Sequence, residues 1–232
     1  MEEILKNIQV NPLFVRLKDI IEHAFEGDKV WHVHESVFDH SVKTLRIAKE
    51  RLGGDFITNH KARELFLQWL ENDVYGSKQK DLSLIIALIH DCGKILSYKE
   101  GEKVETLIRV KPNFSEQSMC PGHEYWGAKI VVPGILKYIN ISEKAKEYIQ
   151  QIIEYHGFFS NPYFPFRQTW SLEQLVSDVK SYYAGDYVEG LFLMYCDGYG
   201  AGAFEFGKKK IEELFNEPSF YIPRKYFIQA NL

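Results

Sequence analysis

The sequence has few cysteines and lacks a long apolar run. Its 232 residues include three cysteines, Cys92, Cys120 and Cys196, and no CxxC spacing. This favours reduced, buried thiols in a cytoplasmic protein over a disulfide framework. The longest apolar run, at 84–89, is far shorter than the ~20 residues of a membrane helix, and the acidic N-terminus does not resemble a secretion signal. We therefore expect a cytoplasmic protein with no membrane partner.

The balance of charge excludes a polycationic surface. The chain has 28 Lys+Arg and 32 Asp+Glu residues, for a formal net charge of -4. An extended nucleic-acid surface is therefore not expected, and an anionic partner has to be bound by a local site. The sequence contains no internal repeat and no linker long enough to separate two domains, so we expect a single domain over residues 1–232.

Helical periodicity dominates the sequence. Apolar residues recur at helical spacing between 13 and 24 and between 37 and 48. Further helices are predicted over Ala62–Asn72, Leu82–Asp91, Glu124–Ile139, Ser142–Tyr155, Leu172–Tyr183 and Tyr187–Phe206. Strand signals are weak, and the best, at 103–111, fits a short β ribbon or an extended loop. The sequence therefore predicts an all-α bundle of about seven to nine helices.

A helix that is apolar nearly all round ends in the pair His90-Asp91. Such a helix belongs in the core, where a carboxylate is unfavourable unless a cation receives it. Gly93 lets the chain turn away, so that both side chains can reach one bound ion. The alternative for this pair alone is a core histidine beside an exposed aspartate at the helix end.

Polar residues at positions expected to face the core recur on other predicted helices. His156 lies on the apolar face of its helix, Asp197 ends the apolar run Leu191–Cys196 of another buried helix, and His40 sits within the amphipathic segment at 37–48. His123 stands at a helix start, where Gly127 gives space one turn later. A single inward polar residue is usually a satisfied core group. Several on separate helices are more economically explained as ligands of a shared metal centre.

These residues resemble the signature of a known superfamily. His40, then His90-Asp91, then Asp197 is similar to the H…HD…D pattern of the HD-domain metal-dependent phosphohydrolases, and HDCGK at 90–94 resembles their HDxGK block. The stretch from His90 through His123 to His156 is closest to the HD domain of bacterial tRNA nucleotidyltransferases. The resemblance implies a single-domain, stand-alone HD-type helical bundle. Its core would span about 36–206, with an N-terminal helical extension at 1–35 and a C-terminal helical tail at 207–232.

The resemblance also implies how the metal is held. In related families the extended set H…HD…H…H…D binds two ions bridged by the HD aspartate. One ion would then be held by His40, His90, Asp91 and Asp197, and a second by Asp91, His123 and His156. Nitrogen and oxygen ligation suits iron, manganese, zinc, cobalt or nickel, as one or two ions, and does not select among them.

Phosphoester hydrolysis at such a centre depends on activating a water and on neutralising charge on phosphoryl oxygens. We expect Asp91, Lys94 and Glu124 to take part. Lys94 would contact a phosphate oxygen or balance the charge near Asp91, the alternative being a solvated cation at a helix end. Glu124, beside His123, would orient a ligand or move a proton, or simply favour the first turn of its helix.

Three further residues are candidates for substrate contact. His32 and His34 lie on one side of an extended entry segment, where they could meet phosphate or protonate a leaving group, or belong to a solvated loop. The aromatic stretch at 157–167 ends in Arg167, and it fits either a stacking wall for a base with Arg167 near a phosphate, or a lid that packs its own rings.

The leading functional hypothesis is therefore a metal-dependent phosphohydrolase that acts on a small phosphoester, with a nucleotide or cyclic nucleotide as the substrate. Two alternatives stay open. The same six residues resemble the ligand set of diiron oxygenases in this superfamily, such as the inositol-oxygenating enzymes. A nucleotide-sensing module with little turnover is the third hypothesis, and the complete ligand set argues against it.

Overall fold

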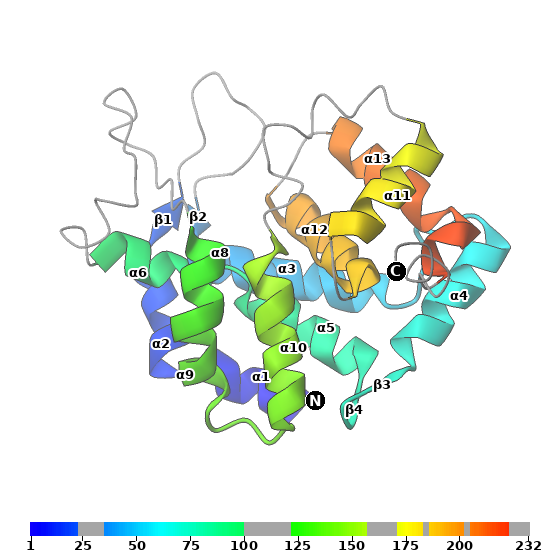
Figure 1. The fold of residues 1–232 in the computed structure, drawn as a ribbon. Helices are drawn as coiled ribbons and strands as arrows, with labels where there is room; N and C mark the ends of the chain where they lie inside the picture. Colours follow the sequence, from blue (N-terminus) through cyan, green and yellow to red (C-terminus); the bar gives the residue numbers. More distant parts are fainter. Residues whose placement is uncertain (23–34, 100–121, 157–170, 183–185, 202–204, 223–232) are drawn as a thin grey trace, which may run out of the picture.

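The computed structural model describes residues 1–22, 35–99, 122–156, 171–182, 186–201 and 205–222. The predicted ribbon at 103–111 lies outside these residues, and so do His32, His34, Cys120 and Arg167. The described residues form a bundle of helices with two small antiparallel sheets (Figure 1). The all-α prediction is confirmed.

The elements follow one another along the described chain as a series of short and medium helices. The first half contains α1 (Glu2–Gln9), α2 (Pro12–Val15), the 3-10 turn η1 (Arg16–Asp19), β1 (Ile21–Glu22), β2 (Glu35–Ser36), α3 (Val37–Arg51), α4 (His60–Leu70), β3 (Asp73–Val74), β4 (Ser77–Lys78), α5 (Gln79–Ile89) and α6 (Lys94–Lys99). The second half contains α8 (His123–Trp126), η2 (Gly127–Val131), α9 (Val132–Leu136), α10 (Glu143–Glu154), α11 (Leu172–Tyr182), α12 (Tyr187–Ala201), α13 (Glu205–Phe215) and the 3-10 turn η5 (Pro218–Tyr221). The predicted helix Tyr187–Phe206 corresponds to α12 and the start of α13, on either side of residues 202–204.

Three helices form the centre of the bundle. α3 packs along both α5 and α12, and α5 also packs on α10 (Figure 1). Every residue of α5 from Leu82 to Ile89 is buried, as its apolar run predicts. Within the described residues, neither α5 nor any other helix is both long enough and apolar enough to cross a bilayer.

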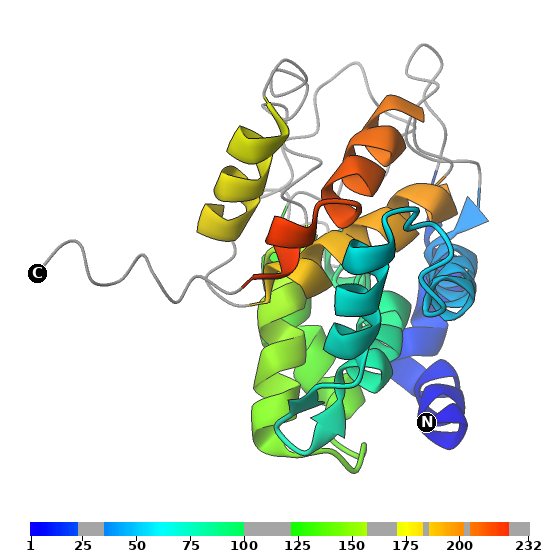
Figure 2. The ribbon, with the colours of Figure 1, turned by 90° about the vertical axis from the view of Figure 1, so that its right-hand side faces the viewer.

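Outer helices cover this centre on two sides. α8, η2 and α9 run beside α10, and α2 contacts α9. On the other side, α11 and α13 pack on α12, and η5 packs on α4 (Figure 2). Aromatic rings from four segments fill the space between α4, α12 and α13, among them Phe56, Phe66, Tyr195 and Phe215.

Side-chain caps fix where two site-bearing helices begin. Ser36 accepts a hydrogen bond from the Asp39 amide at 3.0 Å at the start of α3. Ser142 accepts one from the Ala145 amide at 3.2 Å at the start of α10, the start predicted from the sequence. Each cap stabilises its helix by about 1 kcal/mol. The caps therefore help to fix where α3, which contains His40, and α10, which precedes His156, begin.

The helix predicted over Glu124–Ile139 is not regular. It consists of α8, the π-helical segment η2 and α9, from His123 to Leu136. Pro133 lies one residue after the start of α9 and has no amide hydrogen to give to a carbonyl of the preceding turn. The wider π turn accommodates this gap without ending the helix.

Two short antiparallel strand pairs were not predicted. β1 pairs with β2, and β3 pairs with β4, each over two residues. The β3–β4 turn consists of Tyr75 and Gly76, with φ angles of 55° and 86°, and Asp73 accepts a hydrogen bond from the Gly76 amide. A two-residue turn with both φ angles positive matches the right-handed twist of a hairpin. Non-glycine residues rarely adopt a φ angle near 55°, so Tyr75 gave no turn signal in the sequence.

A buried polar network joins the N-terminal ends of α5 and α12. Glu189 Oε2 accepts hydrogen bonds from Gln79 Nε2 and Ser83 Oγ, both at 2.5 Å. Asp186 accepts one from the Tyr148 hydroxyl at 3.2 Å and another from the Glu189 amide at 3.0 Å. Burial raises the pKa of Glu189 to about 8 and raises that of Asp186 as well. Glu189 is therefore held mainly as the neutral acid at pH 7.

Candidate metal centre

Six polar residues meet at one end of the bundle. His40 lies in α3 and Asp197 in α12, while His90 and Asp91 directly follow α5. His123 begins α8, and His156 follows the end of α10. The six residues predicted as metal ligands therefore come from five separate helices, and the fold brings them together.

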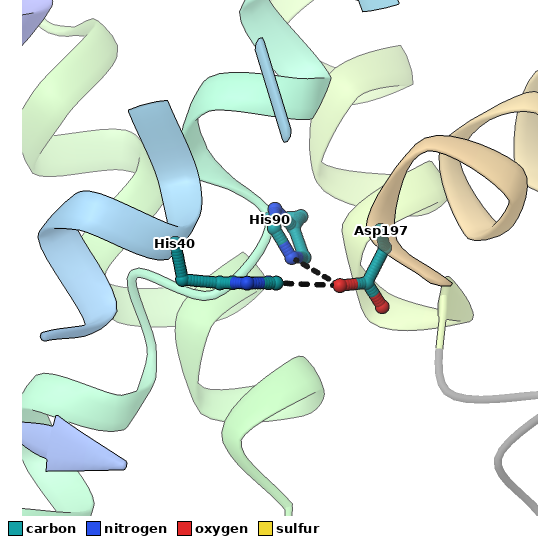
Figure 3. A group of neighbouring side chains, drawn as sticks. All are labelled: His40, His90 and Asp197. Atoms are coloured by element: carbon teal, nitrogen blue, oxygen red, sulfur yellow. Dashed lines mark hydrogen bonds and ion pairs between the residues drawn. The ribbon is translucent and has the colours of Figure 1, made fainter. Parts of the chain in front are cut away.

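The first group consists of His40, His90 and Asp197. Their ligand atoms all lie within 4.8 Å of one another. His40 Nε2 is 2.8 Å from Asp197 Oδ1, and His90 Nε2 is 3.4 Å from the same oxygen. Figure 3 shows both rings directed at this carboxylate from α3 and from the end of α5. Both histidines are buried, whereas the side chain of Asp197 keeps 22% of its surface exposed. Asp197 is thus the solvent-facing member of the group.

The second group consists of Asp91, His123 and His156, again with ligand atoms within 4.8 Å. Asp91 Oδ1 is 2.9 Å from His123 Nε2 and 3.6 Å from His156 Nε2. The other oxygen, Asp91 Oδ2, is 3.4 Å from His90 Nε2 and 3.6 Å from His40 Nε2. The carboxylate of Asp91 therefore lies between the two groups, with one oxygen toward each.

Two of the histidines are oriented by their own helices. His90 Nδ1 lies 3.1 Å from the carbonyl oxygen of Ala87, and His156 Nδ1 lies 2.6 Å from that of Ile153. A carbonyl only accepts hydrogen bonds, so Nδ1 carries the proton in both rings. Nε2 is then the atom that faces the carboxylates. His90 Nε2 is buried and has no hydrogen-bond partner within the described residues.

The other two histidines have carboxylates on their outer side. His123 Nδ1 is 3.4 Å from Glu124 Oε2, and His40 Nδ1 is 3.6 Å from Glu35 Oε1. Glu124 was expected to orient a ligand, and it lies where it can do so. Glu35 was missed, because it precedes the cap of α3 and no helical spacing relates it to His40.

The charges of the centre support one another. Burial alone would lower the pKa of His40, but its hydrogen bond to Asp197 and its contact with Glu35 raise it to about 9. Burial also opposes protonation of His90, yet the nearby charges of Asp91 and Asp197 raise its pKa to about 10. The pKa of Asp197 stays well below its usual range, because the hydrogen bond from His40 and the charge of His90 outweigh burial. Two ionised carboxylates in this interior thus require cationic partners.

Lys94 supplies part of that positive charge. Its Nζ lies 2.8 Å from Asp91 Oδ2, and the residue is only 6% exposed. Burial works to raise the pKa of Asp91, but the charges of Lys94 and His90 hold it well below its usual range. The alternative of a solvated cation at a helix end is therefore wrong for Lys94. Its position fits the expected charge balance at Asp91.

The two described cysteines lie beside the centre as packing residues. Cys92 and Cys196 are buried and free, as the sequence indicated. Burial raises the pKa of both thiols, which disfavours the thiolate form, and neither cysteine belongs to the two ligand groups. The donors that remain are imidazole nitrogens and carboxylate oxygens.

Gly93 is required for a different reason from the one expected. The positive φ angles at described glycines are those of Gly54, Gly76 and Gly122, so the turn after Asp91 needs no left-handed residue. A Cβ on Gly93 would instead lie 1.9 Å from the carbonyl oxygen of His123 and 2.7 Å from the Gly127 backbone. The glycine allows the turn after α5 to contact the start of α8 directly.

The donor set fits a divalent transition metal. The four Nε2 atoms converge on two carboxylates, and His90 Nε2 is buried with no hydrogen-bond partner in the described chain. Neither of the two ligand groups contains a cysteine. Imidazole and carboxylate together suit iron, manganese, zinc, cobalt or nickel. Fold and geometry thus define a class, an all-α domain with a candidate metal centre at the meeting point of its helices.

Comparison with known proteins identifies the family. The family model of the HD domain matches residues 37–201, and the chain belongs to the HD-domain family. This family lies within a superfamily of metal-dependent phosphohydrolases, whose members bind divalent metals. Comparison with curated proteins gives no match to the chain. The closer resemblance to the HD domain of tRNA nucleotidyltransferases, the domain boundaries and the stand-alone organisation stay predictions.

Proposed function

We propose that the protein is a hydrolase that uses one or two divalent transition metal ions to cleave a small phosphoester. His40, His90, Asp91 and Asp197 would hold one ion, and Asp91, His123 and His156 the other. The observation that supports this best is the position of Asp91, whose two oxygens face different groups of histidines. A carboxylate in that position can ligate on both sides.

Bound cations would lower the pKa of a nucleophilic water and neutralise charge on the phosphoryl oxygens. The chain's own residues prepare the centre for this task. Lys94 keeps Asp91 ionised and fixes one of its oxygens. His90 and His156 are held by backbone carbonyls with Nε2 inward, and Glu124 contacts His123 from outside. Asp197, the more exposed carboxylate, lies where substrate can approach.

The nature of the substrate is a finer part of the proposal. Our hypothesis for the substrate is a nucleotide or cyclic nucleotide. We also propose that the protein is cytoplasmic. A chain of net charge -4 has no general attraction for phosphate, so the metal centre would supply it locally. His32, His34 and Arg167 are the proposed substrate contacts, and all three lie outside the described residues.

The first test is elemental analysis of protein purified without chelators, followed by a phosphoester panel with the metal found. Asp91→Asn should lose metal and activity while its thermal unfolding changes little, because the amide keeps the volume and loses the charge. Asp81→Asn, on the same central helix but outside the cluster, is the matched control and should keep both. Full metal content and turnover in Asp91→Asn would contradict the site.

Two other outcomes would contradict the hydrolase proposal. If the iron-loaded protein consumes oxygen in the presence of a substrate and releases phosphate from no ester, the protein is an oxygenase. If the metal-replete protein binds nucleotides and turns none over with any metal, it is a sensing module. The oxygenase and the sensing module would use the same six residues as the hydrolase. Only the reaction assays separate the three functions.

A further inference from the structure

Glu35 lies against the outer side of His40. Its Oε1 is 3.6 Å from His40 Nδ1, while His40 Nε2 on the opposite side of the ring is 2.8 Å from Asp197 Oδ1. The imidazole is therefore placed between two carboxylates. His40 is fully buried, so its ring is confined to this arrangement.

Three contacts fix the position of Glu35. Lys43 Nζ donates to both carboxylate oxygens, at 2.8 and 2.9 Å. Lys43 and His40 are one turn apart on α3, so both face the same carboxylate. The backbone of Glu35 pairs with Glu22 across β1 and β2, and the next residue, Ser36, caps α3. The side chain of Glu35 is only 14% exposed.

A carboxylate on the far nitrogen of a metal-binding histidine fixes the tautomer and the ring orientation, and it makes the ligating nitrogen more basic. His90 and His156 obtain their orientation from backbone carbonyls of their own helices. At Nδ1 of His40 lies the Glu35 side chain, from a residue that precedes α3.

We propose that Glu35, held by Lys43, is a positioning residue that presents Nε2 of His40 to the metal and raises metal affinity at the group of His40, His90 and Asp197. The inference rests on the proposed metal-binding function. It adds a residue outside the six proposed ligands and assigns Glu35 no contact with substrate or metal.

The test compares metal affinity in Glu35→Gln and in a matched control. Zn²⁺ is titrated into metal-free protein against a chelator of known affinity, and Co²⁺ absorption reports the coordination of the bound ion. Glu35→Gln should weaken binding by about 10- to 100-fold and alter the Co²⁺ spectrum. The control, Glu2→Gln, removes another carboxylate that pairs with a lysine of α3, Lys49 at 2.8 Å, and should bind metal like the wild type.

Two further variants keep the test decisive. Thermal unfolding of the metal-free proteins shows whether each variant folds. If Glu35→Gln does not fold, Glu35→Asp keeps the charge and draws the oxygen away from His40 Nδ1, so it should also bind metal more weakly than Glu2→Gln. A folded Glu35 variant that binds Zn²⁺ as tightly as Glu2→Gln, with the same Co²⁺ spectrum, overturns the inference.

His40→Ala separates this inference from the proposed function. If the wild type binds metal and His40→Ala binds it much more weakly, the metal site stands, and the Glu35 variants test the positioning role alone. If the wild type binds no metal, or His40→Ala binds it like the wild type, the assignment of His40 as a ligand fails first.

Discussion

The contact between Gly93 and the start of α8 yields the sharpest structural prediction, for the substitution Gly93→Ala. A methyl group at this position would lie 1.9 Å from the carbonyl oxygen of His123 and 2.7 Å from both Cα and N of Gly127. All three are backbone atoms, so no side-chain rotation relieves the overlap. The approach is close from the other side too, since a Cβ on Gly127 would lie 3.1 Å from Gly93 Cα.

The size of the effect follows from these distances. Real Cβ atoms essentially never approach another atom within 3.0 Å, so the His123 carbonyl would have to retreat by about 1 Å or more. His123 Nε2 is 2.9 Å from Asp91 Oδ1, and a shift of that size opens this contact. Overpacking against backbone should cost about 3 kcal/mol. For a chain of this length, such a loss lowers Tm by roughly 6 to 12 °C.

Thermal unfolding and metal content together test the prediction. Gly53→Ala is the control, because its Cβ would meet nothing closer than 3.4 Å. Gly93→Ala should melt lower than Gly53→Ala. If each group binds an ion as proposed, Gly93→Ala should lose the ion of Asp91, His123 and His156 before that of the other group. Equal melting temperatures and equal metal content in the two variants would refute the steric reasoning.

Two further predictions concern the interior of α12. The pKa of Glu189 is about 8 in the folded protein, against a usual 4.5. Between these two pH values the folded state keeps a proton that the unfolded chain releases. The free energy of unfolding should therefore fall as pH rises, by up to about 1.4 kcal/mol per pH unit. Glu189→Gln cannot ionise and should reduce this slope in urea unfolding at about pH 5 and pH 8, leaving the effects of Asp186, His40 and His90, whose pKa values are also raised. An unchanged slope would contradict the assignment. Gly200→Ala would place a Cβ 2.7 Å from Thr44 Oγ1 and 3.3 Å from His40 Cε1, so it should weaken metal binding. Adding Thr44→Ala should restore most of that affinity, and a double variant no better than the single one would count against this contact.

The main helices could be predicted because burial on one side of a helix leaves a repeat in the sequence. The spacing of apolar residues located α3, α5 and α10, and Ser142 marked where α10 begins. The β3–β4 hairpin left no such repeat, because it is two residues long on each side and turns on Tyr75 at φ 55°. The π segment at η2 depends on one proline, Pro133, whose missing hydrogen bond could be compensated in several ways.

Most residues of the candidate centre could be predicted because each is polar where its helix should be apolar, and His123 was singled out at a helix start beside Gly127. The same logic could not find Glu35 or Gly93. In the sequence, nothing distinguishes Glu35 from the other acidic residues. Its role depends on the fold, because β2 and Lys43 place it beside His40. In the sequence, Gly93 is a typical residue for the end of a helix. In the structure, a glycine is required because the Gly127 backbone lies so close, and this distance depends on how the end of α5 packs against α8.

The ends of two helices explain why the centre forms at this point of the bundle. α5 and α10 both end there, and the last carbonyls of a helix lack partners within it. His90 and His156 each contact a carbonyl three residues earlier through Nδ1, so each imidazole gives a carbonyl of the last turn a side-chain donor and directs Nε2 outward from the helix end. The negative end of the helix dipole favours positive charge at the same place. A histidine at the end of either helix therefore contacts the last turn through Nδ1 and presents Nε2 as a possible metal donor. His90 and His156 do so from opposite groups, and each faces a different oxygen of Asp91.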